Sequence, residues 1–426
     1  MTVATATAAA IRTGVLDNGL TWAVLADPRD RVVSTHVRVR AGSADDPAGR
    51  TGMAHLLEHL MFRGTPNVPD GEFDQRMEAM GVEINASTWL DFTGYTTTAP
   101  PGTLDRVLAL EADRFGRLAL EDAVFAAERD VVANERRQVV ESNPEEVLGE
   151  RLWAAALDGS PYAWPTIGWG ADIAAIERDD VTAWHASRYA PARTAVIVCG
   201  CVNVDAARAA IEATFGQIAP RETVPSPERP GVGSLPTEPV SIAISDGVRA
   251  PRIVIAWPAV GRADAGFAAR VAFDELLAGG ESSRLVQRLV DTDRSATWVD
   301  TATYHHRGAN LQEVHVSLRS GVEPARVVDA IRDEVTRLAE QGPAADELTR
   351  MRQRVETRDA FDLASTSSRA DWMAESFTAF GDVTSAFALT EELATVSTDA
   401  IRAAARDVLD GPWHRGTALP APGADA

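Results

Sequence analysis

The sequence contains no lysine, and all 41 basic residues among its 426 are arginines, which we attribute to codon bias rather than to function. Acidic residues number 62, so the net charge is −21. Because an acidic surface repels phosphate backbones, we expect no nucleic-acid partner. No apolar run approaches the ~18 residues that span a bilayer, and the N-terminus lacks the basic start and apolar core of a secretory signal. We therefore expect a cytoplasmic protein with no role in a membrane.

Cysteine is also scarce. Cys199 and Cys201 are the only two, and they lie in one short stretch rich in valine and isoleucine. A disulfide between positions i and i+2 of a strand would be strained, so no disulfide framework is expected. We interpret both as small, buried apolar side chains.

One proline-rich stretch predicts the domain organisation. Residues 220–240 contain six prolines, a density that forbids helix and favours an extended linker. The linker separates an N-terminal domain of residues 1–219 from a C-terminal domain of residues 241–426. Both lengths are ordinary for a domain with its own hydrophobic core.

The two halves begin alike. An alternating strand over 33–40 is followed by a helical run from Gly52, and a strand over 252–257 is followed by a helical run from Gly266. This suggests a weak duplication in which only the first copy keeps histidines. Mixed helices and strands with short connections predict an α+β fold with largely antiparallel sheets. Further helices are expected over 70–80, 104–118, 122–140, 172–188 and 204–215, and further strands over 82–87, 93–98 and 194–202.

The helical run from Gly52 contains the motif His-x-x-Glu-His. His55 and His59 are four residues apart, so they share one helix face and can bind one metal ion, and Glu58 lies on the same side. Two imidazoles suit zinc, and a neighbouring glutamate can accept a proton from an attacking water. Two histidines one turn apart can also be ordinary core or surface residues. A zinc site of this kind needs a third protein ligand as well.

Several segments together resemble the pitrilysin/insulinase-type zinc peptidases, or inverzincins: residues 40–47, residues 52–65 with the motif, residues 85–95 and residues 128–135. The resemblance is strong from about residue 12 to 220 and otherwise extends mainly to the layout. It implies a mitochondrial processing peptidase-like metallohydrolase fold of two related α/β sandwich domains. The first would be the zinc-binding peptidase domain, and the second a peptidase-like domain without the metal motif.

The resemblance also implies the remaining site residues. The family's third ligand lies about 76 residues after the second histidine, and position 59 + 76 is Glu135. One zinc ion per chain would thus be bound by His55, His59 and Glu135, with Glu58 as the general base. The family places an acidic residue at Glu128, where it could orient a ligating histidine; an exposed helix acid is the alternative.

For the substrate, the family uses the edge of a sheet, onto which an extended peptide adds as a further strand. Asn85 and Ala86 fall at that position. Phe62 resembles a residue that lines the pocket just after the scissile bond, and ordinary core packing is its alternative.

The sequence departs from the family in its second half. Active members carry an arginine and a tyrosine seven residues apart, but Val290 and Thr297 occupy these positions, and no Arg-x6-Tyr pair exists anywhere in the chain. The resemblance therefore implies a heterodimer with a related subunit that lacks the zinc motif and carries the pair. A homodimer is the second possibility, in which Arg284, Arg288, Arg294 or Tyr304 would take this role.

These observations predict a zinc-dependent endopeptidase, the metal-bearing catalytic subunit, with leader or targeting peptides as candidate substrates. Two alternatives of the same fold are a non-catalytic structural core-type subunit and a peptide-binding module that merely retains metal. The complete set of four site residues argues against a scaffold, which has no need of them.

Overall fold

The computed structural model describes residues 10–245, 248 and 250–420. Its contacts divide the chain into two compact units. Unit 1 comprises residues 10–134, 164–227 and 359–388, and unit 2 comprises residues 135–163, 228–358 and 389–420. In the described part of the chain, every helix is too short or too polar to cross a membrane.

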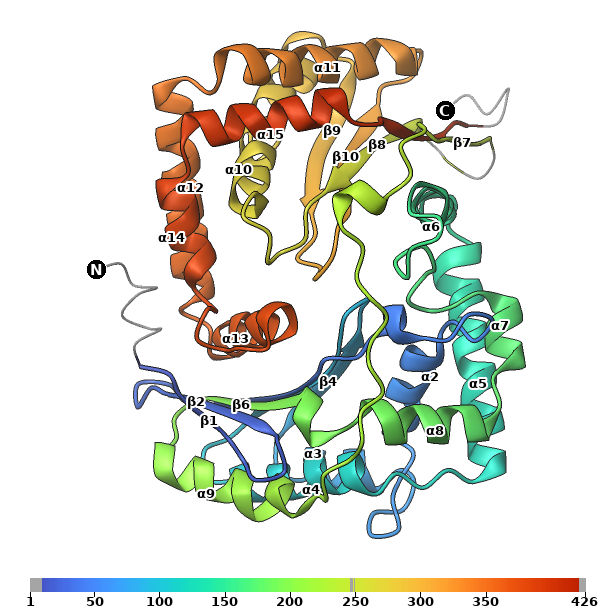
Figure 1. Ribbon diagram of the computed structural model, residues 1–426, viewed down its shortest axis with the longest axis vertical. Helices are drawn as coiled ribbons and strands as arrows, with labels where there is room; N and C mark the ends of the chain where they lie inside the picture. The colour runs from blue at the N-terminus through green and yellow to red at the C-terminus, as the bar shows by residue number, and fades with distance from the viewer. Residues whose placement is uncertain (1–9, 246–247, 249, 421–426) are drawn as a thin grey trace. The chain divides into compact units, whose positions relative to one another are not determined.

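Unit 1 is built on a six-stranded sheet in the order β1-β2-β6-β3-β5-β4 (Figure 1). Neighbouring strands are antiparallel, except that β2 and β6 are parallel. The α+β class with a largely antiparallel sheet is confirmed. The strands are β1 (Arg12–Val15), β2 (Thr21–Ala26), β3 (Val33–Val39), β4 (Glu83–Thr88), β5 (Thr93–Ala99) and β6 (Thr194–Gly200).

Alternating side chains give this sheet two buried faces. Val196 and Val198 of β6 pack into the larger core with the helix that carries the histidine motif. Besides α13, described next, the α-helices of unit 1 are α2 (Met53–Leu60), α3 (Glu72–Glu78), α4 (Leu104–Gly116), α5 (Asp122–Arg136), α7 (Gly170–Ala175), α8 (Arg178–Arg188) and α9 (Val204–Thr214).

The opposite face is covered by α13 (Thr366–Phe380), which is encoded far from the strands it packs on, β3 and β6. Met373 and Phe377 join Ile197 and Cys199 in a second core. Cys199 is fully buried with its sulfur 3.8 Å from that of Met373, so its interpretation as an apolar side chain is confirmed. Cys201 is only partly buried.

Unit 2 contains a five-stranded sheet in the order β7-β11-β8-β10-β9. Its strands are β7 (Ser241–Ile244), β8 (Arg252–Ala259), β9 (Ala296–Thr303), β10 (Asn310–Leu318) and β11 (His414–Ala418). The helices are α6 (Pro144–Ala156), α10 (Phe267–Leu277), α11 (Pro324–Gln341), α12 (Ala345–Asp362), α14 (Ala388–Thr395) and α15 (Thr398–Asp410), with α6 packed on β11 and β7.

The two sheets share one topology. The order β2-β6-β3-β5-β4 in unit 1 corresponds strand for strand to β7-β11-β8-β10-β9 in unit 2, and in each the first pair is parallel and the rest antiparallel. The helix after β3 begins at the N-cap Gly52, and the helix after β8 begins at the N-cap Gly266. The predicted duplication is therefore confirmed. Counted from the two glycines, Ala269, Ala272 and Phe273 stand where the first copy has His55, Glu58 and His59.

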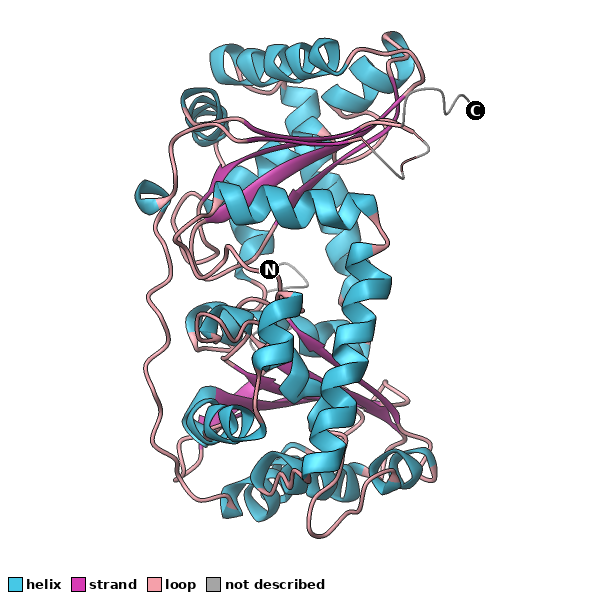
Figure 2. Cartoon of the chain, turned by 90° about the vertical axis from the view of Figure 1, so that its right-hand side faces the viewer, coloured by secondary structure: helices cyan, strands magenta, loops and turns pink. Residues whose placement is uncertain are grey.

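The proline-rich segment lacks helix and strand up to residue 231 and is drawn as an extended pink loop in Figure 2. Within unit 1, Arg188 donates hydrogen bonds to the carbonyls of Val224 and Pro225 at 2.8 and 3.1 Å. Within unit 2, the Pro230 carbonyl accepts from the Ala309 amide at 2.7 Å. Each unit contains residues from both sides of this segment. The predicted division into residues 1–219 and 241–426 therefore describes the two sequence repeats and not the two compact units, and it stays a prediction.

Helix α5 ends earlier than expected. The sequence predicts helix over 122–140, whereas the α-helix ends at Arg136 and residues Arg137–Glu141 form a π-helical turn. Single π turns commonly occur within or beside α-helices near functional sites. The division between unit 1 and unit 2 also falls in this helix, directly before Glu135.

A buried carboxyl group in α10 predicts that the stability of the protein depends on pH. Burial raises the pKa of Asp274 to about 7, although hydrogen bonds with Thr303 and Gln312 act in the opposite direction. An aspartate in an unfolded chain ionises near pH ~4, so between these values the folded protein holds a proton that the unfolded chain has lost.

Stability should therefore fall as the pH rises through this window, and Asp274→Asn should remove that part of the dependence. Between pH 5 and 7 the difference should be about 2–3 kcal/mol, at ~1.4 kcal/mol per pH unit. Urea unfolding of both proteins across this range measures it. Parallel stability curves would contradict the prediction.

Candidate metal centre

Helix α2 carries the histidine motif, and its start is fixed by two residues. Gly52 has a φ of 90°, and a side chain there would meet the Ile167 carbonyl at 2.5 Å, so glycine is required. The carboxylate of Asp46 accepts hydrogen bonds from the backbone amides of Gly52, Met53 and Ala54 at 2.9, 3.1 and 3.0 Å. Three otherwise unpaired donors of the first turn are thereby satisfied. The helix is thus held rigidly at the end from which His55 projects.

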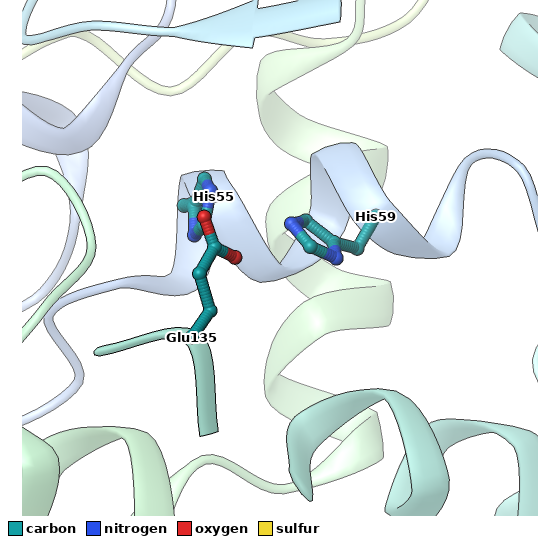
Figure 3. Close-up of side chains that lie close together, drawn as sticks. All are labelled: His55, His59 and Glu135. Atoms are coloured by element: carbon teal, nitrogen blue, oxygen red, sulfur yellow. The ribbon is translucent and has the colours of Figure 1, made fainter. Parts of the chain in front are cut away.

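Three of the predicted site residues converge. One ligand atom each from His55, His59 and Glu135 lies within 4.8 Å of the others, and Figure 3 shows the glutamate facing the two imidazoles. The two rings are edge to face with centroids 4.7 Å apart. Glu135 is the second-last residue of α5. Within the described residues, this is the one such group of three potential ligands.

The donor set suits a zinc ion. Zinc prefers imidazole nitrogen and carboxylate oxygen at ~2.0–2.2 Å, and three protein ligands leave a fourth position open for water or substrate. Burial, together with the smaller effect of the neighbouring His59, lowers the pKa of His55 to about 3. His55 is therefore neutral at physiological pH, as a metal-binding imidazole must be.

Glu128 lies two helical turns before Glu135 and is only 4% exposed, so the alternative of an exposed helix acid is wrong. One of its oxygens is 3.1 Å from Nδ1 of His59, and the other accepts from Nε of Arg63 at 2.5 Å. Burial raises the pKa of Glu128, but the hydrogen bonds from His59 and Arg63 and the charges of these two residues together leave the pKa below its usual value. An ionised carboxylate at Nδ1 leaves Nε2 of His59 available for a metal.

Glu58 is buried at 8% exposure, and its Oε2 accepts a hydrogen bond from the hydroxyl of Thr88 at 2.5 Å. Thr88 is the last residue of β4 and has no sequence signal of its own. The sequence therefore does not predict this contact, which joins the motif helix to the edge of the sheet.

Strand β4 is an edge strand, since in the described part of the chain it pairs only with β5. Asn85 on this strand is exposed and Ala86 is partly buried, and the Asn85 side chain accepts from the Ala86 amide at 2.9 Å. Both predicted substrate residues thus lie on an open sheet edge. Their part in substrate binding stays a prediction.

Phe62 belongs to an aromatic cluster around a buried arginine. Its ring centroid is 5.8 Å from that of Phe73 and 6.2 Å from that of Tyr95. The guanidinium of Arg114 lies 4.4–4.5 Å from all three ring centroids. Glu111 neutralises that guanidinium with hydrogen bonds of 2.7–2.9 Å. Phe62 is therefore fixed by packing, and its place in a substrate pocket stays a prediction.

Comparison with known proteins finds zinc proteases and peptidases of one family. The sequence profile described as "Insulinase (Peptidase family M16)" matches residues 21–169, and that described as "Peptidase M16 inactive domain" matches residues 175–355. The chain is 31% identical over 333 residues to "Zinc protease PqqE" of Helicobacter pylori, an alignment that covers 76% of this chain and 73% of that protein.

Two further similarities extend the comparison. The chain is 28% identical over 208 residues to "Probable mitochondrial-processing peptidase subunit beta" of Schizosaccharomyces pombe, covering 49% of this chain and 45% of that protein. Among solved structures, a protease from Helicobacter pylori superposes with a TM-score of 0.89 at 24% identity, covering 96% of this chain and 99% of the other. That superposition supports the two-domain fold.

Proposed function

The chain belongs to the insulinase family of peptidases, peptidase family M16, and from this premise we propose that it is the zinc-bearing catalytic subunit of an endopeptidase. The observation that carries the proposal is the convergence of His55, His59 and Glu135 on one position, with Glu58 on the same helix as the histidines. A scaffold subunit needs none of these residues. A module that only binds peptides needs no general base.

The chain's own residues have distinct parts in the proposed reaction. When bound, zinc supplies the Lewis acid that activates water and polarises the scissile carbonyl. Glu58 accepts the proton of the attacking water on its carboxylate and returns it to the leaving amine. Glu128 holds His59 through Nδ1. Strand β4 receives an extended peptide along its open edge, where Asn85 and Ala86 lie.

We further propose that a related subunit completes the site. In this chain, the other candidates for the missing arginine and tyrosine are engaged elsewhere. The Tyr304 hydroxyl donates to Glu313 at 2.8 Å. Arg284 donates to Glu347 at 2.7 and 2.8 Å, and Arg288 donates to Asp293 at 2.9 Å.

Arg294 remains as the residue on which a homodimer could rely. It is exposed and adopts a φ of 48°. The name of the Schizosaccharomyces pombe relative, a subunit beta, is consistent with activity shared between chains. The heterodimer is our first proposal and the homodimer our second. Leader or targeting peptides as substrates, and a cytoplasmic location, stay predictions.

Zinc content tests the proposed centre directly. The purified chain should bind about one zinc ion, and the double variant His55→Ala/Glu135→Gln should bind none at micromolar zinc. The reason is that disturbing even the groups behind a metal ligand costs about 10–100-fold in affinity. Metal analysis after dialysis measures this. Peptide cleavage should stop after treatment with a chelator and return when zinc is added.

Asp130→Asn is the matched control, because it removes an exposed carboxylate from the same helix α5. It should retain full zinc. Full zinc occupancy in the double variant would contradict the assignment of the ligands.

A further inference from the structure

The hydrogen bond between Thr88 and Glu58 connects two elements with different proposed tasks. Glu58 lies on α2 beside the metal ligands, and Thr88 ends β4, the strand that carries Asn85 and Ala86. The two side chains are 8% and 9% exposed, and the hydroxyl donates to Oε2 at 2.5 Å. Helix α2 and strand β4 pack against each other, so this hydrogen bond lies inside an existing interface.

A carboxylate rotates freely about its last torsion unless a neighbour holds it, because terminal sp³–sp² torsions have broad minima. A hydroxyl that donates to one oxygen fixes the plane of the group and directs the other oxygen. Hydrogen bonds to an ionised acceptor are also about twice as strong as those between neutral groups. Burial strengthens the interaction further, because less water competes for Oε2.

We propose that Thr88 is a positioning residue for the general base. Its hydroxyl orients the Glu58 carboxylate and ties the position of that carboxylate to strand β4. The Glu58 carboxylate and strand β4 are then held at a fixed position relative to each other. A peptide paired with β4 therefore presents its scissile bond at a constant distance from Glu58. The inference rests on the proposed function, and Thr88 is not among the three converging metal ligands.

Two variants separate the hydroxyl from the shape of the side chain. Thr88→Val removes the donor at nearly constant size, and Thr88→Ser keeps the donor. With an internally quenched peptide, kcat should fall about 10- to 100-fold in the valine variant, since small misplacements of a catalytic group cost about this much. KM and zinc content should not change. The serine variant should recover most of kcat.

Thr93→Val is the matched control. Thr93 lies directly opposite Thr88 on β5, is fully buried, and donates its hydroxyl to the Ala41 carbonyl at 3.1 Å instead of to Glu58. Its kcat should stay close to that of the unmodified chain. An unchanged kcat in Thr88→Val, or equal losses in the Thr88 and Thr93 valine variants, would overturn the proposal.

Unfolding in urea supplies a readout that needs no hydrolysis. Introduced into the unmodified chain, Thr88→Val should lower the unfolding midpoint. Introduced into the Glu58→Ala variant, where the acceptor of the hydrogen bond is missing, it should lower the midpoint much less. Equal shifts in both backgrounds would overturn the assignment of Thr88. If the unmodified chain hydrolyses no peptide, with or without a partner, that result would count against the proposed function. The comparison of unfolding midpoints would then still test whether Thr88 holds Glu58.

Discussion

Replacing Glu58 by glutamine is expected to reduce kcat for peptide hydrolysis by about 10²–10⁴-fold, the usual contribution of a general base. Glutamine has the same size and can still accept the hydrogen bond from Thr88, so the fold should be preserved. It cannot take a proton from water. Zinc content should remain at about one ion per chain, because Glu58 is not among the three converging ligands.

The measurement is a comparison of kcat, zinc content and unfolding midpoint between the variant and the unmodified chain. Glu78→Gln, an exposed glutamate in α3, is the matched control and should leave all three unchanged. Turnover by a zinc-loaded Glu58→Gln protein at the normal rate would mean that another group is the base. Peptide binding without turnover in the unmodified chain would favour a binding module.

The second large effect concerns the partner subunit. The purified chain alone should cleave peptides about 10²–10³-fold more slowly than a mixture with a related chain that carries the arginine–tyrosine pair, because removing one donor to the developing oxyanion costs this much. Val290 and Thr297 supply neither a charge nor a phenol. Rates of peptide cleavage before and after mixing, with size-exclusion chromatography of the complex, measure the effect.

Arg294→Gln distinguishes the two assemblies. In a heterodimer, this substitution should leave the rate of the mixture unchanged. If the chain alone cleaves as fast as the mixture, the shared site is wrong. A loss of activity in Arg294→Gln alone would then identify the arginine on which a homodimer relies.

Much of the fold was predictable because its signals are local. Alternation over 33–40 predicted β3, and a glycine before an apolar helical run marked equivalent helices at Gly52 and Gly266. Because His55 and His59 are four residues apart, the helical period predicted that they share one face of the helix. Glu135, by contrast, came from family resemblance, since nothing in its immediate sequence distinguishes it from other helix acids.

Contacts between distant segments had no such signal. The donation from Thr88 to Glu58 joins a strand to a helix 30 residues earlier, and neither residue type predicts the pairing. The packing of Arg114 among three aromatic rings depends on a tertiary arrangement in which a buried charge is neutralised by Glu111. The packing of α13 on β3 and β6 is also a product of topology alone.

That last arrangement has a consequence for biosynthesis. Apart from α13, the strands and helices of unit 1 described above all precede residue 228, but the face formed by Ile197 and Cys199 is buried by Met373 and Phe377 of α13. A ribosome, which adds roughly 5–20 residues per second, must therefore translate about 150 further residues before the sheet of unit 1 can be buried on both sides. During that interval the nascent chain displays the apolar surface that Met373 and Phe377 later cover, and transiently exposed apolar surface of this kind makes a folding chain prone to aggregation.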